Sequence, residues 1–135
     1  MFQPDLHGFQ RVLLLVGLIC LGGCVGLPGT RADELDNTAR TYLKALRWGS
    51  YESVAVFHHP SKLHLDADYF AQFKVVSAEL LQPPVPEEGR AQQIVEIAYM
   101  RTDQQRIRSL KVQQTWVYDS TRKIWLLDAD LPPMH

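Results

Sequence analysis

The sequence predicts an α+β domain in which N-terminal helices pack on one face of a curved, four-stranded antiparallel sheet. Three observations predict this class. Apolar residues recur at helical spacing between residues 35 and 46, and the apolar period changes to two from residue 74 onward. The predicted strands then follow one another without intervening helices, which favours hairpins and antiparallel pairing.

The first predicted helix begins after Thr30. Residues 30–33 read Thr-Arg-Ala-Asp, which resembles a capping box with Asp in place of the usual Glu. The apolar spacing i, i+4, i+7, i+8, i+11 predicts about four turns with one buried face. Gly49 is suited to the position that follows the helix. The buried face is predicted to hold Leu35, Ala39, Tyr42, Leu43 and Leu46.

Two shorter helices are predicted before the sheet. Ser50 can cap the second helix, and Pro60 ends it because proline cannot continue a helix. Asp66 can cap a third helix that runs through Phe73 and buries Phe70 and Phe73. The apolar face of the second helix comprises Val54, Ala55 and Phe57.

Four strands are predicted, at residues 75–81, 93–101, 107–118 and 124–129. Turn-forming segments separate them at residues 83–89, 102–104 and 119–122. Alternation predicts one inward face on each of the two long strands. These faces are Val95, Ile97 and Tyr99 on the second strand, and Leu110, Val112, Trp116 and Tyr118 on the third.

The composition excludes several classes of protein. The chain has 135 residues and a net charge of −1, with 14 Lys+Arg against 15 Asp+Glu. A basic excess that could hold a phosphate backbone is missing, so no nucleic-acid partner is expected. The 112 residues from position 24 onward can bury one core but not two.

The N-terminal residues are typical of a secretory signal peptide. Residues 12–21 read VLLLVGLICL and follow Arg11, and small residues come after them. Ten residues of helix span about 15 Å, half of a bilayer core of roughly 30 Å, so a transmembrane helix is not expected.

The cleavage region resembles the lipobox of bacterial lipoproteins. Residues 21–24 read Leu-Gly-Gly-Cys. The resemblance implies cleavage before Cys24, a thioether-linked diacylglycerol on Cys24 and N-acylation of the same residue. Cys20 is a poorer candidate because bulky Ile19 precedes it. The alternative is that both cysteines are simply apolar members of the signal sequence.

The lipobox sets the expected domain organisation and location. Residues 1–23 would be the signal peptide, residues 24–29 a lipidated tether, and residues 30–135 the folded domain. Several acyl chains hold a protein stably on a membrane. Val25 stands where enterobacterial lipoproteins retained at the inner membrane carry Asp. The resemblance therefore favours the outer membrane, with the domain facing the periplasm.

The folded region resembles NTF2-like domains. Residues 42–52, YLKALRWGSYE, are similar to the opening helix pair of that family, and WVY at 116–118 followed by KIWLL at 123–127 is similar to its final hairpin. Together with the lipobox, the chain resembles small NTF2-like lipoproteins of Gram-negative bacteria. The family implies a cone-shaped fold, a pocket between the helices and the concave sheet face, and dimerisation through the sheet. It includes ketosteroid isomerases, dehydratases and non-enzymatic binding modules, so the fold alone does not choose a function.

A polar cluster at residues 58–68 holds His58, His59 and His64 with two aspartates. Imidazole and carboxylate suit Zn²⁺ and other transition metals, but the spacing matches no familiar metal motif. The alternative is a loop whose histidines cap the C-terminus of the second helix, where a protonated imidazole is favoured. No metal or cofactor is expected.

Four residues are candidates to line the cone pocket: Tyr42, Tyr99, Gln114 and Trp116. An isomerase site needs a base and an oxyanion donor in the pocket. Tyr99 could donate, but alternation places Glu96 on the opposite strand face. The catalytic residues of the family therefore cannot be transferred to this chain. The alternative is that the aromatic candidates are core residues.

Motifs for covalent catalysis are missing: there is no Gly-x-Ser-x-Gly, no phosphate-binding glycine run and no cysteine after Cys24. The basic residues Arg101, Arg106, Arg108 and Lys111 could contact lipid head groups or cell-wall anions, or simply protect a sheet edge.

These observations predict a membrane-anchored binding or assembly module without catalytic activity, with an envelope protein or an apolar ligand as its partner. The alternative is a small isomerase or hydrolase acting on an apolar substrate in the cone. A third possibility is a homodimer formed through the outer sheet face, where Ile94, Ala98 and Met100 lie.

Overall fold

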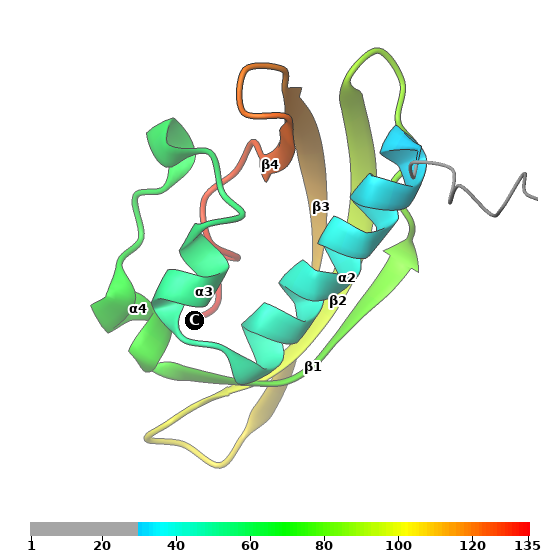
Figure 1. Ribbon diagram of the computed structural model, residues 1–135. Helices are drawn as coiled ribbons and strands as arrows, with labels where there is room; N and C mark the ends of the chain where they lie inside the picture. Colours follow the sequence, from blue (N-terminus) through cyan, green and yellow to red (C-terminus); the bar gives the residue numbers. More distant parts are fainter. Residues whose placement is uncertain (1–29) are drawn as a thin grey trace, which may run out of the picture.

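The computed structural model describes residues 30–135. The signal peptide, Cys24 and the tether predicted at residues 1–29 lie outside the described residues. The described chain forms helices α2 (Arg31–Trp48), α3 (Tyr51–Ala55) and α4 (Ala67–Ala71), a 3-10 helix η2 (Pro60–Lys62) and four strands. The helices pack against one face of a strongly curled antiparallel sheet, which confirms the predicted α+β class (Figure 1).

The long helix α2 has the N-terminus that the sequence predicts. The Thr30 side chain accepts the backbone N–H of Asp33, and the Asp33 carboxylate accepts the backbone N–H of Thr30. The helix has 18 residues, one turn more than expected. Gly49 ends it with an extended φ of −91° rather than a left-handed one. A glycine is needed at this position for lack of space, because a Cβ on residue 49 would lie 2.7 Å from the Ala45 carbonyl oxygen.

The two shorter helices start where predicted and end earlier. Ser50 accepts the N–H of Ser53 at the start of α3, and Asp66 accepts the N–H of Tyr69 at the start of α4. The third helix does not reach Phe73, because Phe73 is the first residue of strand β1 (Phe73–Gln82) and is buried there. A five-residue helix is too short to be stable alone, so packing against the rest of the chain fixes these ends.

The sheet is a meander of order β1-β2-β3-β4, with β2 (Arg90–Arg101), β3 (Ile107–Asp119) and β4 (Ile124–Leu127). The three predicted hairpins are confirmed, and the first two strands begin two and three residues before the predicted positions. Edge strand β1 carries irregularities between Val75 and Ser77 and between Leu80 and Gln82. Such bulges bend a strand and increase its twist, which helps the sheet to curl.

Strand β4 ends two residues before the predicted position. Beyond Leu127 the chain leaves the sheet and runs along its concave side, where Leu131, Pro132 and Met134 are buried. The β4 backbone is also paired outside the meander: Leu127 N–H donates to Phe57 O at 2.7 Å, and His59 N–H donates to Leu127 O at 2.8 Å. The segment after α3 therefore extends the sheet at β4.

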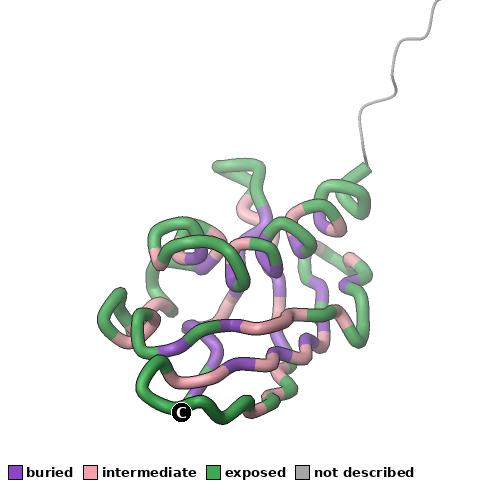
Figure 2. The backbone as a smooth tube through the Cα atoms, turned by 90° about the horizontal axis from the view of Figure 1, so that it is seen from below, coloured by how far each residue is buried: buried purple, intermediate pink, exposed green. Residues whose placement is uncertain are grey.

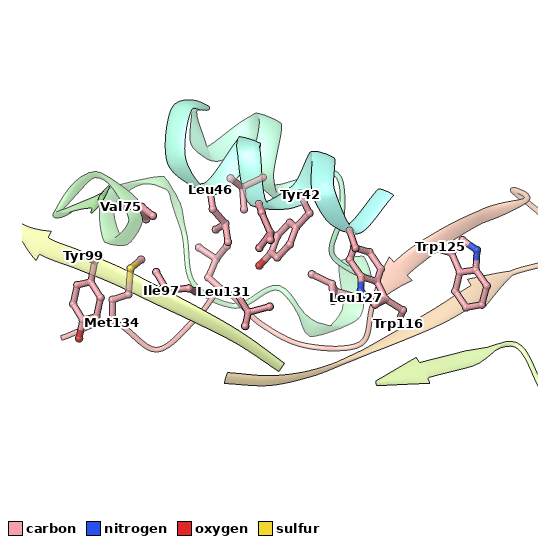
Figure 3. Close-up of a cluster of buried hydrophobic side chains, with 14 of the residues drawn as sticks. Tyr42, Leu46, Val75, Ile97, Tyr99, Trp116, Trp125, Leu127, Leu131 and Met134 are labelled. Carbon is pink, nitrogen blue, oxygen red and sulfur yellow. The ribbon is translucent and has the colours of Figure 1, made fainter. Parts of the chain in front are cut away.

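One hydrophobic core fills the space between α2, the concave sheet face and the segment after β4 (Figure 3). Buried and partly exposed positions alternate along β2 (Figure 2), and the inward faces predicted for β2 and β3 are confirmed. The predicted buried face of α2 is also confirmed, with all five of its residues in the core: Leu35, Ala39, Tyr42, Leu43 and Leu46.

Candidate functional site

All four pocket candidates are buried in the core, where Tyr42, Gln114 and Trp116 lie together and Tyr99 lies apart from them. Tyr42 lies on α2, Tyr99 on β2, and Gln114 and Trp116 on β3, and the exposed fraction of each is 2% or less. In Figure 3, Tyr42 points from α2 toward the sheet, with Trp116 close by. The Tyr42 and Trp116 rings are in edge contact, with centroids 5.9 Å apart. These side chains therefore contribute to the packing that joins α2 to the sheet.

A buried chain of hydrogen bonds joins Tyr42 to both central strands. Gln93 and Gln114 are register partners, and Gln93 Nε2 donates to Gln114 Oε1 at 2.9 Å. Gln114 Nε2 then donates to the Tyr42 hydroxyl at 3.3 Å. Burial raises the pKa of Tyr42, and the bond from Gln114 only partly opposes this. The phenol is therefore neutral at physiological pH, and the Gln93–Gln114–Tyr42 network is uncharged.

Sequence reasoning missed Gln93. Alternation along β2 was the available signal, because Gln93 precedes Val95 by two residues and so shares its inward face. An amide among apolar neighbours costs free energy unless it is hydrogen-bonded, and Gln93 Nε2 and Gln114 Oε1 satisfy each other. The Gln93 carbonyl oxygen and the Trp116 indole nitrogen are buried without a partner among the described residues.

Tyr99 lies at the other end of the core and is bonded to the segment after β4. Its hydroxyl donates to His135 O at 3.2 Å and accepts the His135 N–H at 3.3 Å. Tyr69 holds the same segment, donating toward Pro132 O at 2.8 Å and Met134 O at 2.9 Å. Glu96 lies on the outer face, where it accepts a bond from Ser109, so the prediction that it faces away from Tyr99 is confirmed.

The three histidines have separate roles. His58 is buried, with Nδ1 2.8 Å from Ala129 O. A carbonyl only accepts, so Nδ1 carries the proton, and Nε2 has no partner among the described residues. His59 Nδ1 accepts the Ser61 N–H and so caps η2, while the His64 side chain is exposed. Within residues 30–135, no group of three or more His, Cys, Asp or Glu side chains could hold a metal ion.

The expectation that these histidines cap the second helix as protonated imidazoles is wrong for His58 and His59. Desolvation lowers the pKa of His58, although the bond to Ala129 and the nearby Asp130 charge oppose this. The ring is therefore neutral at pH 7 and packs edge-on against Tyr42, with centroids 5.4 Å apart. His59 caps the start of η2, not the end of α3.

Asp130 fixes the loop that holds His64. Its carboxylate accepts the backbone N–H groups of His64, Leu65 and Leu131 at 2.8–3.0 Å. Burial alone would raise the pKa of Asp130, but these donors lower it below its ordinary value. The Asp130 carboxylate therefore joins the loop at His64 and Leu65 to the segment after β4.

Three surface hollows lie outside the core. One of about 380 Å³ is between α2 and the β3–β4 turn, and another of about 470 Å³ is beside the β1–β2 loop. The third, of about 660 Å³, runs between the second half of α2 and edge strand β1. None of the four sequence candidates lines these three hollows. The third has the most distinctive chemistry, because Arg40, Lys44, Arg47 and Trp48 line it on the helical side together with Leu43.

Comparisons with known proteins bear on the fold. No protein-family model matches the sequence, and no curated protein matches it. The chain is similar to a conserved protein from Planctomyces limnophilus (17% identity, TM-score 0.48), over 75% of this chain and 94% of that protein. It is also similar to a SEC-C motif containing protein from Psychrobacter arcticus (16% identity, TM-score 0.51). That match covers 81% of this chain and 65% of that protein, and at this identity it shows the fold alone.

Within residues 30–135, no helix has both the length and the apolar character needed to cross a membrane.

Proposed function

We propose that this protein is a lipoprotein of the bacterial envelope whose domain binds a protein or an apolar ligand without catalysis. Lipid on Cys24 holds it to the outer membrane, and the domain faces the periplasm. The observation that carries the proposal is the run Leu-Gly-Gly-Cys at residues 21–24, placed directly after an apolar segment. Small residues before the cysteine allow a peptidase to reach the backbone at the membrane surface.

The position of the domain relative to Cys24 supports the proposal. Helix α2 begins at Arg31, so only residues 25–30 separate the lipidated cysteine from the fold. Six residues span at most about 21 Å when fully extended. Such a tether confines the domain to a thin layer at the leaflet and raises its effective concentration for partners in that membrane.

The contacts of the core tyrosines support binding rather than catalysis. An isomerase of the family's type would use hydroxyl donors aimed at a substrate. Here the Tyr42 hydroxyl is bonded to Gln114, and the Tyr99 hydroxyl is bonded to His135. An isomerase or hydrolase that uses Tyr99 would need the segment after β4 to move, because the Tyr99 hydroxyl is bonded to His135.

We assign the domain to the NTF2-like group as part of the proposal. Support comes from the order of its elements, a long helix, two short helices and then a curled antiparallel meander. The family's outer-face dimer is a further proposal. Ile94, Ala98 and Met100 are partly exposed on the face of β2 that such a dimer would cover.

The test of the anchor compares two cysteines. We expect Cys24→Ser to abolish incorporation of labelled fatty acid in the native host and to release the protein from the membrane fraction. The matched control is Cys20→Ser, four residues earlier in the same segment, which should keep both the label and the membrane location. Mass spectrometry of the wild type should show a mature chain that starts at acylated Cys24.

Two results would overturn the anchor: an unmodified chain that starts at Met1, or a Cys24→Ser protein that is still lipid-labelled. A label lost in Cys20→Ser but kept in Cys24→Ser would move the lipidation site to Cys20.

A further inference from the structure

The groove between α2 and β1 has a basic helical wall that the core does not use. Arg40, Lys44 and Arg47 follow the spacing i, i+4, i+7, so they lie on one face of α2. Trp48 continues this wall with 76% of its surface exposed. Glu79 on β1 is the one acidic residue among those that line the groove. We call Arg40, Lys44, Arg47 and Trp48 the basic wall.

Two cations of the basic wall are free to meet an anion. Arg40 is paired with Asp36 at 2.9 Å, whereas neither Lys44 nor Arg47 forms an ion pair within residues 30–135. The Arg47 guanidinium carbon lies 4.5 Å from the Trp48 ring centroid. This contact places a cation beside the exposed indole at the end of the helix.

The exposed indole distinguishes Trp48 from the other tryptophans of the chain. Trp116 and Trp125 are 0% and 3% exposed and belong to the core. An indole surrounded by Lys and Arg side chains is typical of the membrane interface, where the ring lies at headgroup level and the cations meet anionic lipid. The groove of about 660 Å³ has the size of a small-ligand site.

We propose that the basic wall docks on anionic phospholipid headgroups of the leaflet that holds the anchor. This inference rests on the proposed lipidation of Cys24. Helix α2 is about 27 Å long from its 18 residues, so a helix lying along the leaflet brings Trp48 to the headgroups while the tether stays short.

The charges along α2 set the direction of docking. Asp33 and Glu34 lie in the first turn, at the anchor end, and Lys44 and Arg47 lie in the last two turns. Anionic headgroups are attracted to the last two turns more strongly than to the first, where the two carboxylates outweigh the single cation Arg31. The Trp48 end of the helix is therefore the end that contacts the leaflet.

The test uses the mature lipidated protein in vesicles of phosphatidylcholine, with or without phosphatidylglycerol, and with brominated lipid as a short-range quencher. Docking should shift the tryptophan emission to the blue and quench it only when phosphatidylglycerol is present. Trp48→Phe should remove the response, because the other two tryptophans are buried. Lys44→Glu with Arg47→Glu should remove it as well, since each cation lost weakens the contact by about fivefold.

The matched control is Arg122→Glu with Lys123→Glu, which changes the net charge equally at two exposed positions in the turn between β3 and β4 and should keep the response. Flotation of the vesicles reports the anchor separately. If the protein floats with the vesicles but its tryptophan emission is the same with and without phosphatidylglycerol, this inference alone is overturned. If the protein floats with neither kind of vesicle, the proposed anchor is overturned. The docking of the basic wall on the leaflet is then overturned as well, because it rests on the anchor.

Two further results would assign the groove to another occupant. The same emission change with glycerol phosphate and no vesicles would overturn the leaflet as the source of the headgroup. A change produced by polyglutamate but not by phosphatidylglycerol would assign the basic wall to an acidic protein segment.

Discussion

The inner and outer faces of α2 make different use of one helix. The inner face buries Tyr42 and Leu46 against the sheet, whereas the outer face exposes Arg47 and Trp48. The Tyr42 ring is in edge contact with three other rings, whereas the Trp48 ring stacks with one cation, Arg47. Stability is therefore expected to reside in the inner face, and the outer face is free to vary or to bind.

The largest expected effect separates two tryptophans. Trp116→Ala should lower the free energy of unfolding by about 3–5 kcal/mol, because it leaves a cavity in a closed core. Trp48→Ala should change it by less than about 0.5 kcal/mol, because the ring is mostly in water. Urea unfolding of both variants measures the difference. Equal losses would contradict the division between the two faces.

A smaller effect is expected inside the core, where the buried amides depend on each other. Gln114→Leu should cost about 1–3 kcal/mol, since it leaves Gln93 Nε2 buried without an acceptor. Gln93→Leu combined with Gln114→Leu should cost less than Gln114→Leu alone, because the unsatisfied group is removed with its partner. Losses that simply add in the double variant would show that the amide pair contributes no coupling.

The smallest effect is a pH dependence from His58. Its pKa is lower in the fold than the ordinary 6.5, so the unfolded chain binds more protons between the two pKa values. The contribution of His58 to the free energy of unfolding should be fully present above pH 6.5. It should fall as the pH drops from 6.5 toward the lower pKa of the folded state, by at most about 1.4 kcal/mol per pH unit. His58→Asn should flatten the profile, measured by urea unfolding at a series of pH values.

The matched control for this profile is His64→Asn, because His64 is exposed. It should leave the slope near pH 6 unchanged. A slope that persists in His58→Asn and disappears in His64→Asn would place the titrating group on the surface. Asp130 acts in a separate window, because its lowered pKa places its loss of charge below pH 3.8.

Local signals predicted most of the elements. The cap at Thr30, the caps at Ser50 and Asp66, and the alternation along β2 depend on residues within a few positions of each other. Their physical causes are short-range: a side-chain oxygen reaching an N–H two or three residues on, and side chains alternating across a strand. Such signals fail at the ends of elements, where packing decides, as at Phe73 and Leu127.

The contacts that define the interior were decided by the tertiary structure. Gln93 meets Gln114 across 21 positions, Gln114 meets Tyr42 across 72, and His58 meets Ala129 across 71. The sequence by itself determined the class of fold and the inward face of each long strand, whereas the lipobox read at residues 21–24 stays a prediction. Only the fold decided which buried polar groups satisfy one another and that the chain after Leu127 fills the concave face. The physical reason is that hydrophobic periodicity fixes which side of an element turns inward, whereas the partner of a buried donor or acceptor depends on how distant elements meet.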